Sequence, residues 1–156
     1  MSSLLFPAPR PGYKSKTLAA WIALVGGSLG LHRFYLYGWR DLVGWLHPLP
    51  TLIGLGGILR MNNLGLDDHW AWALIPILGL MLSTTMLMAI IYGLMPDERW
   101  NARFNPQGPE HHAGWSTVCA VVLSLLLGAT ALMATLAFGG ERFFEWQVEE
   151  ARKISQ

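Results

Sequence analysis

Four long runs without Asp, Glu, Lys or Arg constrain the fold of this chain more than any other feature. They cover residues 17–31, 42–59, 70–95 and 116–140. A helix needs about 17–25 predominantly apolar residues to cross the hydrocarbon core of a bilayer. Because lipid offers no hydrogen bonds to the backbone, and the runs lack the alternation of barrel strands, each run is expected to be a helix. The pattern predicts an all-α integral membrane protein with four transmembrane helices arranged as two hairpins.

Composition supports this class and excludes several others. Only 13% of the residues are charged and 53% are hydrophobic, whereas about a quarter of the residues of a soluble domain are charged. The net charge of +1 includes no basic block, so no nucleic-acid partner is expected. Cys119 is the single cysteine and lies inside an apolar run, which excludes an intrachain disulfide and a thiolate cluster. No cofactor is predicted.

The chain divides into four parts by composition. These are a proline-rich tail (1–16), a first helical hairpin (17–65), a second transmembrane hairpin (66–140) and an amphipathic C-terminal tail (141–156). In the C-terminal tail, Phe144, Val148 and Ala151 fall on one helical face, as in a soluble helical tail or a helix that lies on the membrane surface. Both interpretations of this tail stay open.

The distribution of basic residues gives an expected orientation. With four spans, the N-terminal tail, the second connector and the C-terminal tail share one side and hold 3, 1 and 3 basic residues, seven in all. The other two connectors hold four. Since cytoplasmic flanks carry the excess of Lys and Arg, both termini are expected in the cytoplasm.

The first run is too short to cross a bilayer by itself. It has 15 residues, or about 22 Å of helix, against a hydrocarbon core of about 30 Å. A helix that continues to Tyr37 would reach about 31 Å. His32 and Arg33 would then lie near the far interface, where an arginine snorkels toward water or pairs with a carboxylate. Asp41 is the nearest candidate partner of Arg33.

Small residues recur at helical spacing in two of the runs. Gly26 and Gly30 would share a face with Arg33 on a continuous helix, and Ala120, Ser124 and Gly128 recur every four residues. Such faces allow close approach of another helix. They serve either packing within the chain or contact with a partner. The helix-packing or interface candidates are Gly26, Gly30, His32, Arg33, Tyr35, Asp41, Ala120, Ser124 and Gly128.

One motif resembles a known family. The stretch KSKTLAAWIALVGGSLGLHRFYLYGW, residues 14–39, is similar to the signature of the TM-two domain, a family of small membrane proteins with two helices around a glycine-rich turn and an HRFY motif. The matching residues are Lys14, Lys16, Leu18, Ala19, Gly26, Gly27, Gly30, His32, Arg33, Phe34, Tyr35, Leu36 and Gly38. In the family a glycine usually follows the tyrosine and leucine directly, whereas here Tyr37 precedes Gly38. The resemblance covers about the first 45 residues and implies membrane residence and a structural or accessory role, without site residues.

Two further patterns are interpreted as structural. His47 lies beside Pro48 and Pro50, which bend or break a helix, and a single histidine there is interpreted as a hydrogen-bonded packing residue rather than a proton relay or haem ligand. Glu110, His111 and His112 carry metal-binding atoms, but adjacent histidines point in different directions and no second cluster completes a site. No metal is predicted, and the segment is interpreted as a surface loop.

These observations lead to two hypotheses of different classes. The first is a non-enzymatic protein of the bacterial inner membrane, a structural or accessory helix-packing module that forms a homo-oligomer or joins a larger membrane complex. The second is a small transporter or channel subunit with His32, Arg33 and Asp41 at a polar entrance, as intramembrane charge would indicate.

Overall fold

The computed structural model describes residues 12–155, and every regular element in that part of the chain is a helix. The elements are α2 (Lys16–Gly26), the 3₁₀ turn η1 (Gly27–Leu29), α3 (Leu31–Tyr37), α4 (Leu42–Leu46), α5 (Pro48–Leu64), α6 (His69–Leu94), α7 (Asp97–Phe104) and α8 (Trp115–Ile154). The all-α prediction is therefore confirmed for the described residues. Most of the expected proline-rich tail, residues 1–11, lies outside them.

Three helices are long and apolar enough to cross a membrane. They are Leu42–Leu64, which joins α4 to α5, then α6 and α8, and they correspond to the second, third and fourth uncharged runs. By length and composition they support a membrane protein. The first run differs, because α2 has only 11 residues, about 16 Å of helix and half of a bilayer's hydrocarbon core.

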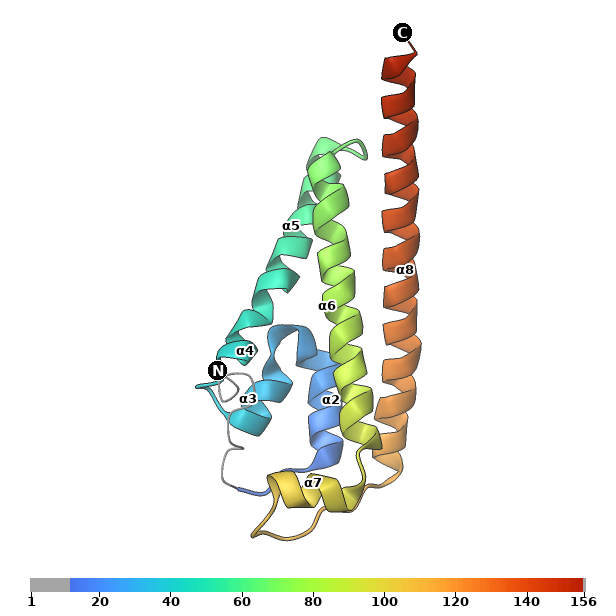
Figure 1. Ribbon diagram of the computed structural model, residues 1–156. Coiled ribbons are helices and arrows are strands. Elements are labelled where there is room, and N and C mark those ends of the chain that lie inside the picture. Colours follow the sequence, from blue (N-terminus) through green and yellow to red (C-terminus); the bar gives the residue numbers. More distant parts are fainter. Residues whose placement is uncertain (1–11, 156) are drawn as a thin grey trace.

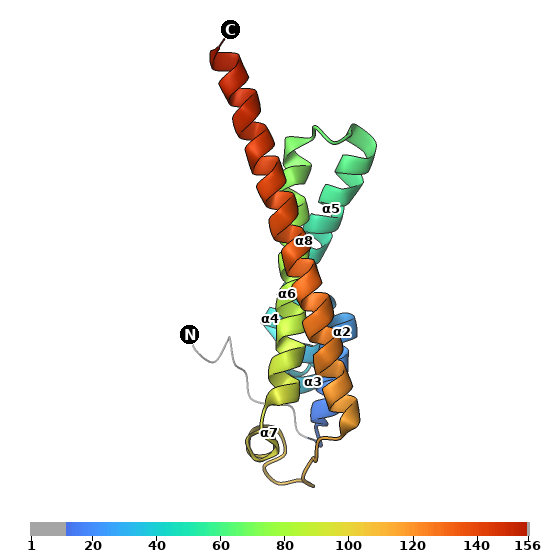
Figure 2. The ribbon, with the colours of Figure 1, turned by 90° about the vertical axis from the view of Figure 1, so that its right-hand side faces the viewer.

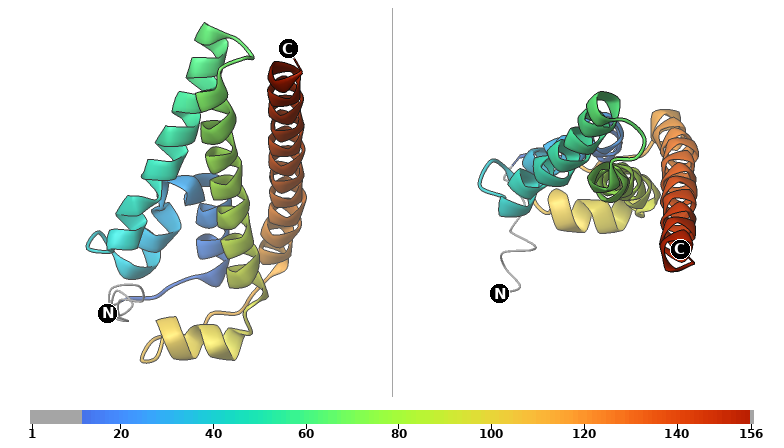
Figure 3. Two further views of the ribbon diagram at one scale, coloured as in Figure 1. Left: turned by 45° about the horizontal axis from the view of Figure 1, so that its top comes forward. Right: turned by 90° about the horizontal axis from the view of Figure 1, so that it is seen from above.

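The three long helices lie side by side with α6 in the middle. In Figures 1 and 3, α5 and α8 flank α6, and α7 crosses below them. We call the end of the long helices near Leu94 and Trp115 the α7 end, and the end near Leu64 and His69 the Gly65 end. The α2 helix packs against α6 and α8 and occupies only the half of the molecule at the α7 end (Figure 1).

The hydrophobic core lies in that same half. Its buried members come from α2, α3, α6 and α7, and they are Ala19, Ala23, Leu24, Leu36, Ala89, Tyr92, Trp100 and Phe104. Trp100 is the largest fully buried side chain among the described residues. The α7 end is thus a packed helical bundle, while the Gly65 end consists of α5, α6 and α8 alone (Figure 1).

Prolines interrupt the second run as expected. The Asp41 carboxylate caps α4 by accepting a hydrogen bond from the Gly44 amide at 3.1 Å. The interruption falls at His47, and α5 begins at Pro48, where a proline's missing amide proton costs no helical hydrogen bond. Because the His47 backbone stays in the α-helical region, α4 and α5 together form one long helix, Leu42–Leu64.

The C-terminal tail continues the last span. α8 has 40 residues and runs without a break through Gly139 and Gly140. Its final turns project beyond α5 and α6 at the Gly65 end (Figure 2). The tail is therefore helical and collinear with the apolar part of α8.

Candidate functional site

The expectation of one continuous helix from residue 17 to Tyr37 is wrong. The α-helix ends at Gly26, a 3₁₀ turn follows, and Gly30 adopts a φ of 77°. A side chain at Gly30 would also collide with the Gly44 backbone. The chain therefore reverses at residues 27–30, and α3 returns toward the α7 end (Figure 1). Gly26, Gly30 and Arg33 do not share one helical face, and His32 and Arg33 lie in the half of the molecule where α2 begins.

The return of α3 brings Arg33 to Asp41, as the sequence predicted. The Arg33 guanidinium donates through Nε to Asp41 Oδ2 at 2.5 Å and through Nη2 to Oδ1 at 3.1 Å. Only 11% of the Arg33 side chain and none of the Asp41 side chain is exposed. The same carboxylate caps α4. This pair consequently fixes the turn between α3 and α4 and compensates both buried charges.

Two histidines lie beside the ion pair. The ring of His32 lies 5.2 Å from the ring of His47 and 5.8 Å from that of Tyr92. His47 donates through Nδ1 to the Val43 carbonyl at 2.6 Å, which agrees with a packing role. His32 is only 1% exposed, and its Nδ1 has no hydrogen-bond partner in the described part of the chain.

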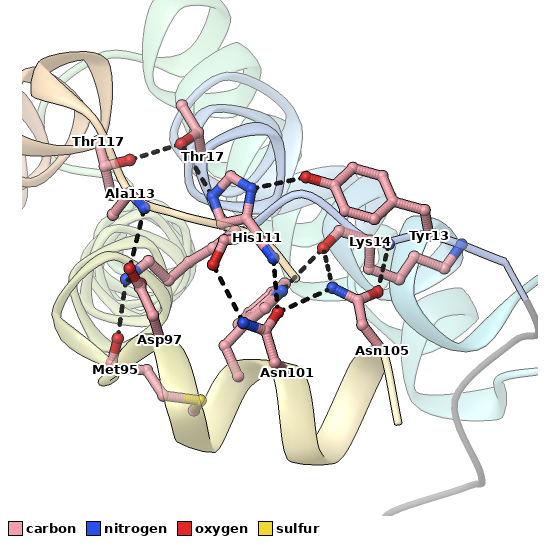
Figure 4. Close-up of polar contacts among 12 residues, drawn as sticks. Tyr13, Lys14, Thr17, Met95, Asp97, Asn101, Asn105, His111, Ala113 and Thr117 are labelled. Carbon is pink, nitrogen blue, oxygen red and sulfur yellow. Dashed lines mark hydrogen bonds and ion pairs between the residues drawn. The ribbon is translucent and has the colours of Figure 1, made fainter. Parts of the chain in front are cut away.

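A network that the sequence did not predict closes the α7 end. We call it the polar cap, and its members are Tyr13, Lys14, Lys16, Thr17, Asp97, Asn101, Asn105, His111 and Thr117 (Figure 4). The Lys14 amide donates to Asn105 Oδ1 at 2.7 Å, and Asn105 Nδ2 donates to the Lys14 carbonyl at 3.0 Å. Trp100 Nε1 donates to the same carbonyl at 2.8 Å. The side chains of Trp100 and Asn105 therefore hold the segment before α2 through the backbone groups of Lys14.

His111 joins four segments within the cap. Its Nδ1 lies 2.8 Å from the Tyr13 hydroxyl, and its Nε2 lies 3.4 Å from the Thr17 hydroxyl. Thr17 in turn contacts the Thr117 hydroxyl of α8 at 2.5 Å. The backbone of His111 also exchanges two hydrogen bonds with the Asn101 side chain of α7, at 2.9 and 3.1 Å. The connector predicted as a surface loop is thus partly buried and ordered by these contacts.

Lys16 binds the cap to the end of α6. Its Nζ donates to the Met95 carbonyl at 2.9 Å and forms an ion pair with Asp97. Asp97 Oδ2 also accepts the Ala113 amide at 3.0 Å. The Lys16 hydrogen bond, supported by the Ala113 amide, holds the pKa of Asp97 below its ordinary value. The carboxylate therefore stays ionised and holds three segments together.

The predicted small-residue face of α8 packs within the chain. Ala120, Ser124 and Gly128 are buried, and a side chain at Gly128 would meet Met86 of α6. Tyr35 also has an internal role, since its hydroxyl accepts the Ser15 amide at 2.9 Å. Gly26 and Gly30 thus lie at the reversal between α2 and α3, His32, Arg33 and Asp41 lie at or beside the ion pair, Tyr35 lies beside Ser15, and the three small residues of α8 are buried in the bundle. The nine candidates do not converge on one site.

The sequence contains only a weak indication of the polar cap. Trp100 and Phe104 are four residues apart in DERWNARF, a spacing that places both on one helical face, and that pattern indicates α7. Nothing in the sequence pairs Asn101 with His111 or Lys14 with Asn105. Within residues 12–155, no group of three or more metal-binding side chains is positioned to hold an ion. His112, unlike His111, is highly exposed.

Comparisons with protein-family models, curated proteins and solved structures find no match to this chain. The similarity to the TM-two domain therefore stays a prediction from the residues of the motif.

Proposed function

We propose that this protein is a non-enzymatic integral membrane protein that acts as a structural or accessory helix-packing module, as a homo-oligomer or within a larger membrane complex. One observation supports the proposal best. In the most apolar windows of the three long helices, only 22%, 17% and 22% of the residues are buried within the chain. Most of each span is thus available to lipid or to other membrane helices.

The first test is copurification of the tagged protein from native membranes in mild detergent, with a native mass measurement. The expected result is a stoichiometric partner or a defined homo-oligomer. A partner-free monomer would exclude the proposal. Since the face of Ala120 is used internally, a partner must contact outward residues such as Ala134 and Ala137 of α8, which are exposed. Leucine at both positions should lower the assembled mass, whereas Gly56→Leu, in open space on α5, serves as the matched control.

The topology that we infer has three spans and one half-inserted pair. α2 and α3 enter and leave the membrane at the α7 end, as a re-entrant pair whose backbone is covered by protein. With three spans the two ends of the described chain face opposite sides, in place of the expected cytoplasmic location of both. Six of the described Lys and Arg residues lie in the half at the α7 end and four in the other half, which favours a cytoplasmic α7 end.

Cysteine labelling tests this topology. In a Cys119→Ser background, Gly108→Cys at the α7 end and Ser155→Cys at the Gly65 end are each treated with a membrane-impermeant maleimide in intact cells. The three-span topology predicts labelling of Ser155→Cys alone until the membrane is opened. Labelling of Gly108→Cys alone in intact cells, as four spans with both termini in the cytoplasm would give, would contradict this orientation.

The TM-two resemblance supports a bacterial inner-membrane location and an accessory role, both as proposals. The alternative function, a transporter or channel subunit, is favoured by the buried, unpartnered His32 Nδ1 beside His47 and the Arg33–Asp41 pair. Ionisable residues in membrane segments often mark ion or proton pathways. Ion or proton flux into proteoliposomes that is lost in His32→Gln and Arg33→Ala would support transport. Flux unchanged by both substitutions would exclude these two residues from a transport pathway.

A further inference from the structure

The polar cap depends on one titratable side chain that links segments distant in sequence. Tyr13 and His111 are 98 residues apart, and Thr17 and Thr117 are 100 apart. The His111 ring contacts the hydroxyls of both Tyr13 and Thr17, and His111 is only 7% exposed. Figure 4 shows the ring between Tyr13 and Thr17, with α7 below it. A change in the hydrogen-bonding capacity of this ring therefore affects several segments at once.

We propose that the polar cap is a pH-sensitive latch, in which protonation of His111 releases the segment before α2 and the 105–113 segment from α7. In the neutral ring one nitrogen donates and the other accepts, so the ring accepts a hydrogen bond from one of the Tyr13 and Thr17 hydroxyls and donates to the other. In the protonated ring both nitrogens are donors, so one hydroxyl must turn its proton away, and a second positive charge is placed near Lys16 in a buried position. The latch is an addition to the proposed packing role and does not depend on it.

The surroundings of His111 offer little compensation for a positive charge. The titratable or polar groups that act on it are Tyr13 from the segment before α2, Lys16 and Thr17 from α2, Asp97 and Asn101 from α7, and His112 from its own segment. Thr117 of α8 bonds to Thr17, and Glu110 pairs with His112. Lys16 repels the imidazolium. Asp97 attracts it, but this carboxylate already binds Lys16 and the Ala113 amide.

The direction of the pH effect follows from these contacts. Burial lowers the pKa of His111, the attraction of Asp97 opposes this effect, and the repulsion of Lys16 and His112 adds to it. The released segment binds a proton at the ordinary histidine pKa of about 6.5. The closed cap is thus fully stable above about pH 6.5 and loses stability as the pH falls from there through the lower pKa of the closed state.

Hydrogen–deuterium exchange of the full chain in lipid nanodiscs tests the latch. Nanodiscs expose both faces, so the result is independent of the orientation in the cell. After correction for the intrinsic effect of pH on exchange, segments 12–17 and 105–113 should lose protection several-fold between pH 7.5 and pH 5.5, while α6 keeps its protection. Unchanged protection of both segments at pH 5.5 would overturn the proposal.

Three variants assign the effect to the ring. His111→Gln removes the titration and should abolish the pH dependence, whereas His112→Gln, at a highly exposed position, should respond like the wild type. Tyr13→Phe removes the hydroxyl that contacts Nδ1 and should lower the protection of segment 12–17 at pH 7.5, even if His111→Gln fails to fold. A full acid response in His111→Gln, or wild-type protection in Tyr13→Phe at pH 7.5, would contradict the latch.

Discussion

Two arginine–aspartate pairs with nearly the same geometry lie at opposite ends of this molecule. Arg33 and Asp41 are eight residues apart, and so are Arg60 and Asp68. In both pairs Nε donates to Oδ2 and Nη2 to Oδ1, at 2.5 and 3.1 Å in the first and at 2.9 and 3.0 Å in the second. Each pair closes a turn between two helices.

Burial distinguishes the two pairs. The side chains of Arg33 and Asp41 are 11% and 0% exposed, whereas 44% of the Arg60 side chain is exposed. Loss of one partner in a buried pair leaves an uncompensated charge, while an exposed pair is screened by water. The comparison teaches that the same local geometry contributes strongly to stability only where both side chains are buried, as they are between α3 and α4. The α7 end should thus be rigid and the Gly65 end tolerant of substitution.

A matched pair of tryptophan substitutions should give the largest difference between the ends. Trp100 is fully buried and donates a hydrogen bond to Lys14, whereas Trp70 is 71% exposed. Trp100→Ala leaves a large cavity and should cost about 3–5 kcal/mol of stability. Trp70→Ala should change the unfolding midpoint in mild detergent far less. Equal losses would show that the α7 end is not the stable half.

Removal of one partner from each ion pair tests this comparison directly. Asp41→Ala leaves the Arg33 charge buried and the α4 cap unmade, so it should cost about 3 kcal/mol. Arg60→Ala at the Gly65 end should lower the unfolding midpoint less, because 44% of the Arg60 side chain and 9% of the Asp68 side chain are exposed, against 11% and 0% in the first pair. The comparison would fail if the two variants unfolded at the same denaturant concentration.

Two glycines with positive φ extend the test to the backbone. Gly30 has a φ of 77° and Gly65 a φ of 99°. Gly65→Ala meets no atom within 4 Å, so only backbone strain of about 1–2 kcal/mol is expected. Gly30→Ala would also press on the Gly44 backbone, which should add about 1–3 kcal/mol. The measurement is the difference in unfolding free energy between the two variants, and a difference near zero would contradict the tight reversal at residues 27–30.

A threonine pair provides the smallest expected effect. Thr117 is buried and shares its hydroxyl hydrogen bond with Thr17 of α2, whereas Thr130 is exposed and bonds to the Leu126 carbonyl of its own helix. Thr117→Val should cost about 1 kcal/mol through the lost interhelical hydrogen bond. Thr130→Val should be neutral within error, and an equal cost for both would remove the link between α2 and α8 from the packed half.

Several features of the site could be predicted from the sequence, and others could not. The spacing of Arg33 and Asp41 predicted their pairing because opposite charges at the end of an apolar segment must find each other. The small residues of α8 predicted close packing, but whether they face α6 or a partner depends on which helices are neighbours. The contacts of His111 with Tyr13 and Thr17 join positions nearly 100 residues apart, and no local periodicity encodes them.

The sequence by itself determined the all-helical class and the three helices that are long and apolar enough to cross a membrane, because the length and apolarity of a run decide whether a helix matches the hydrocarbon core of a bilayer. Only the tertiary structure decided that the chain reverses at residues 27–30. Gly30 can adopt a positive φ, but the reversal is stabilised by its contact with Gly44 and by the ion pair of Arg33 with Asp41. Contacts between distant segments likewise make residues of the connector between α6 and α8 part of the polar cap. The hydrogen bonds and burial of these residues depend on which groups meet in space.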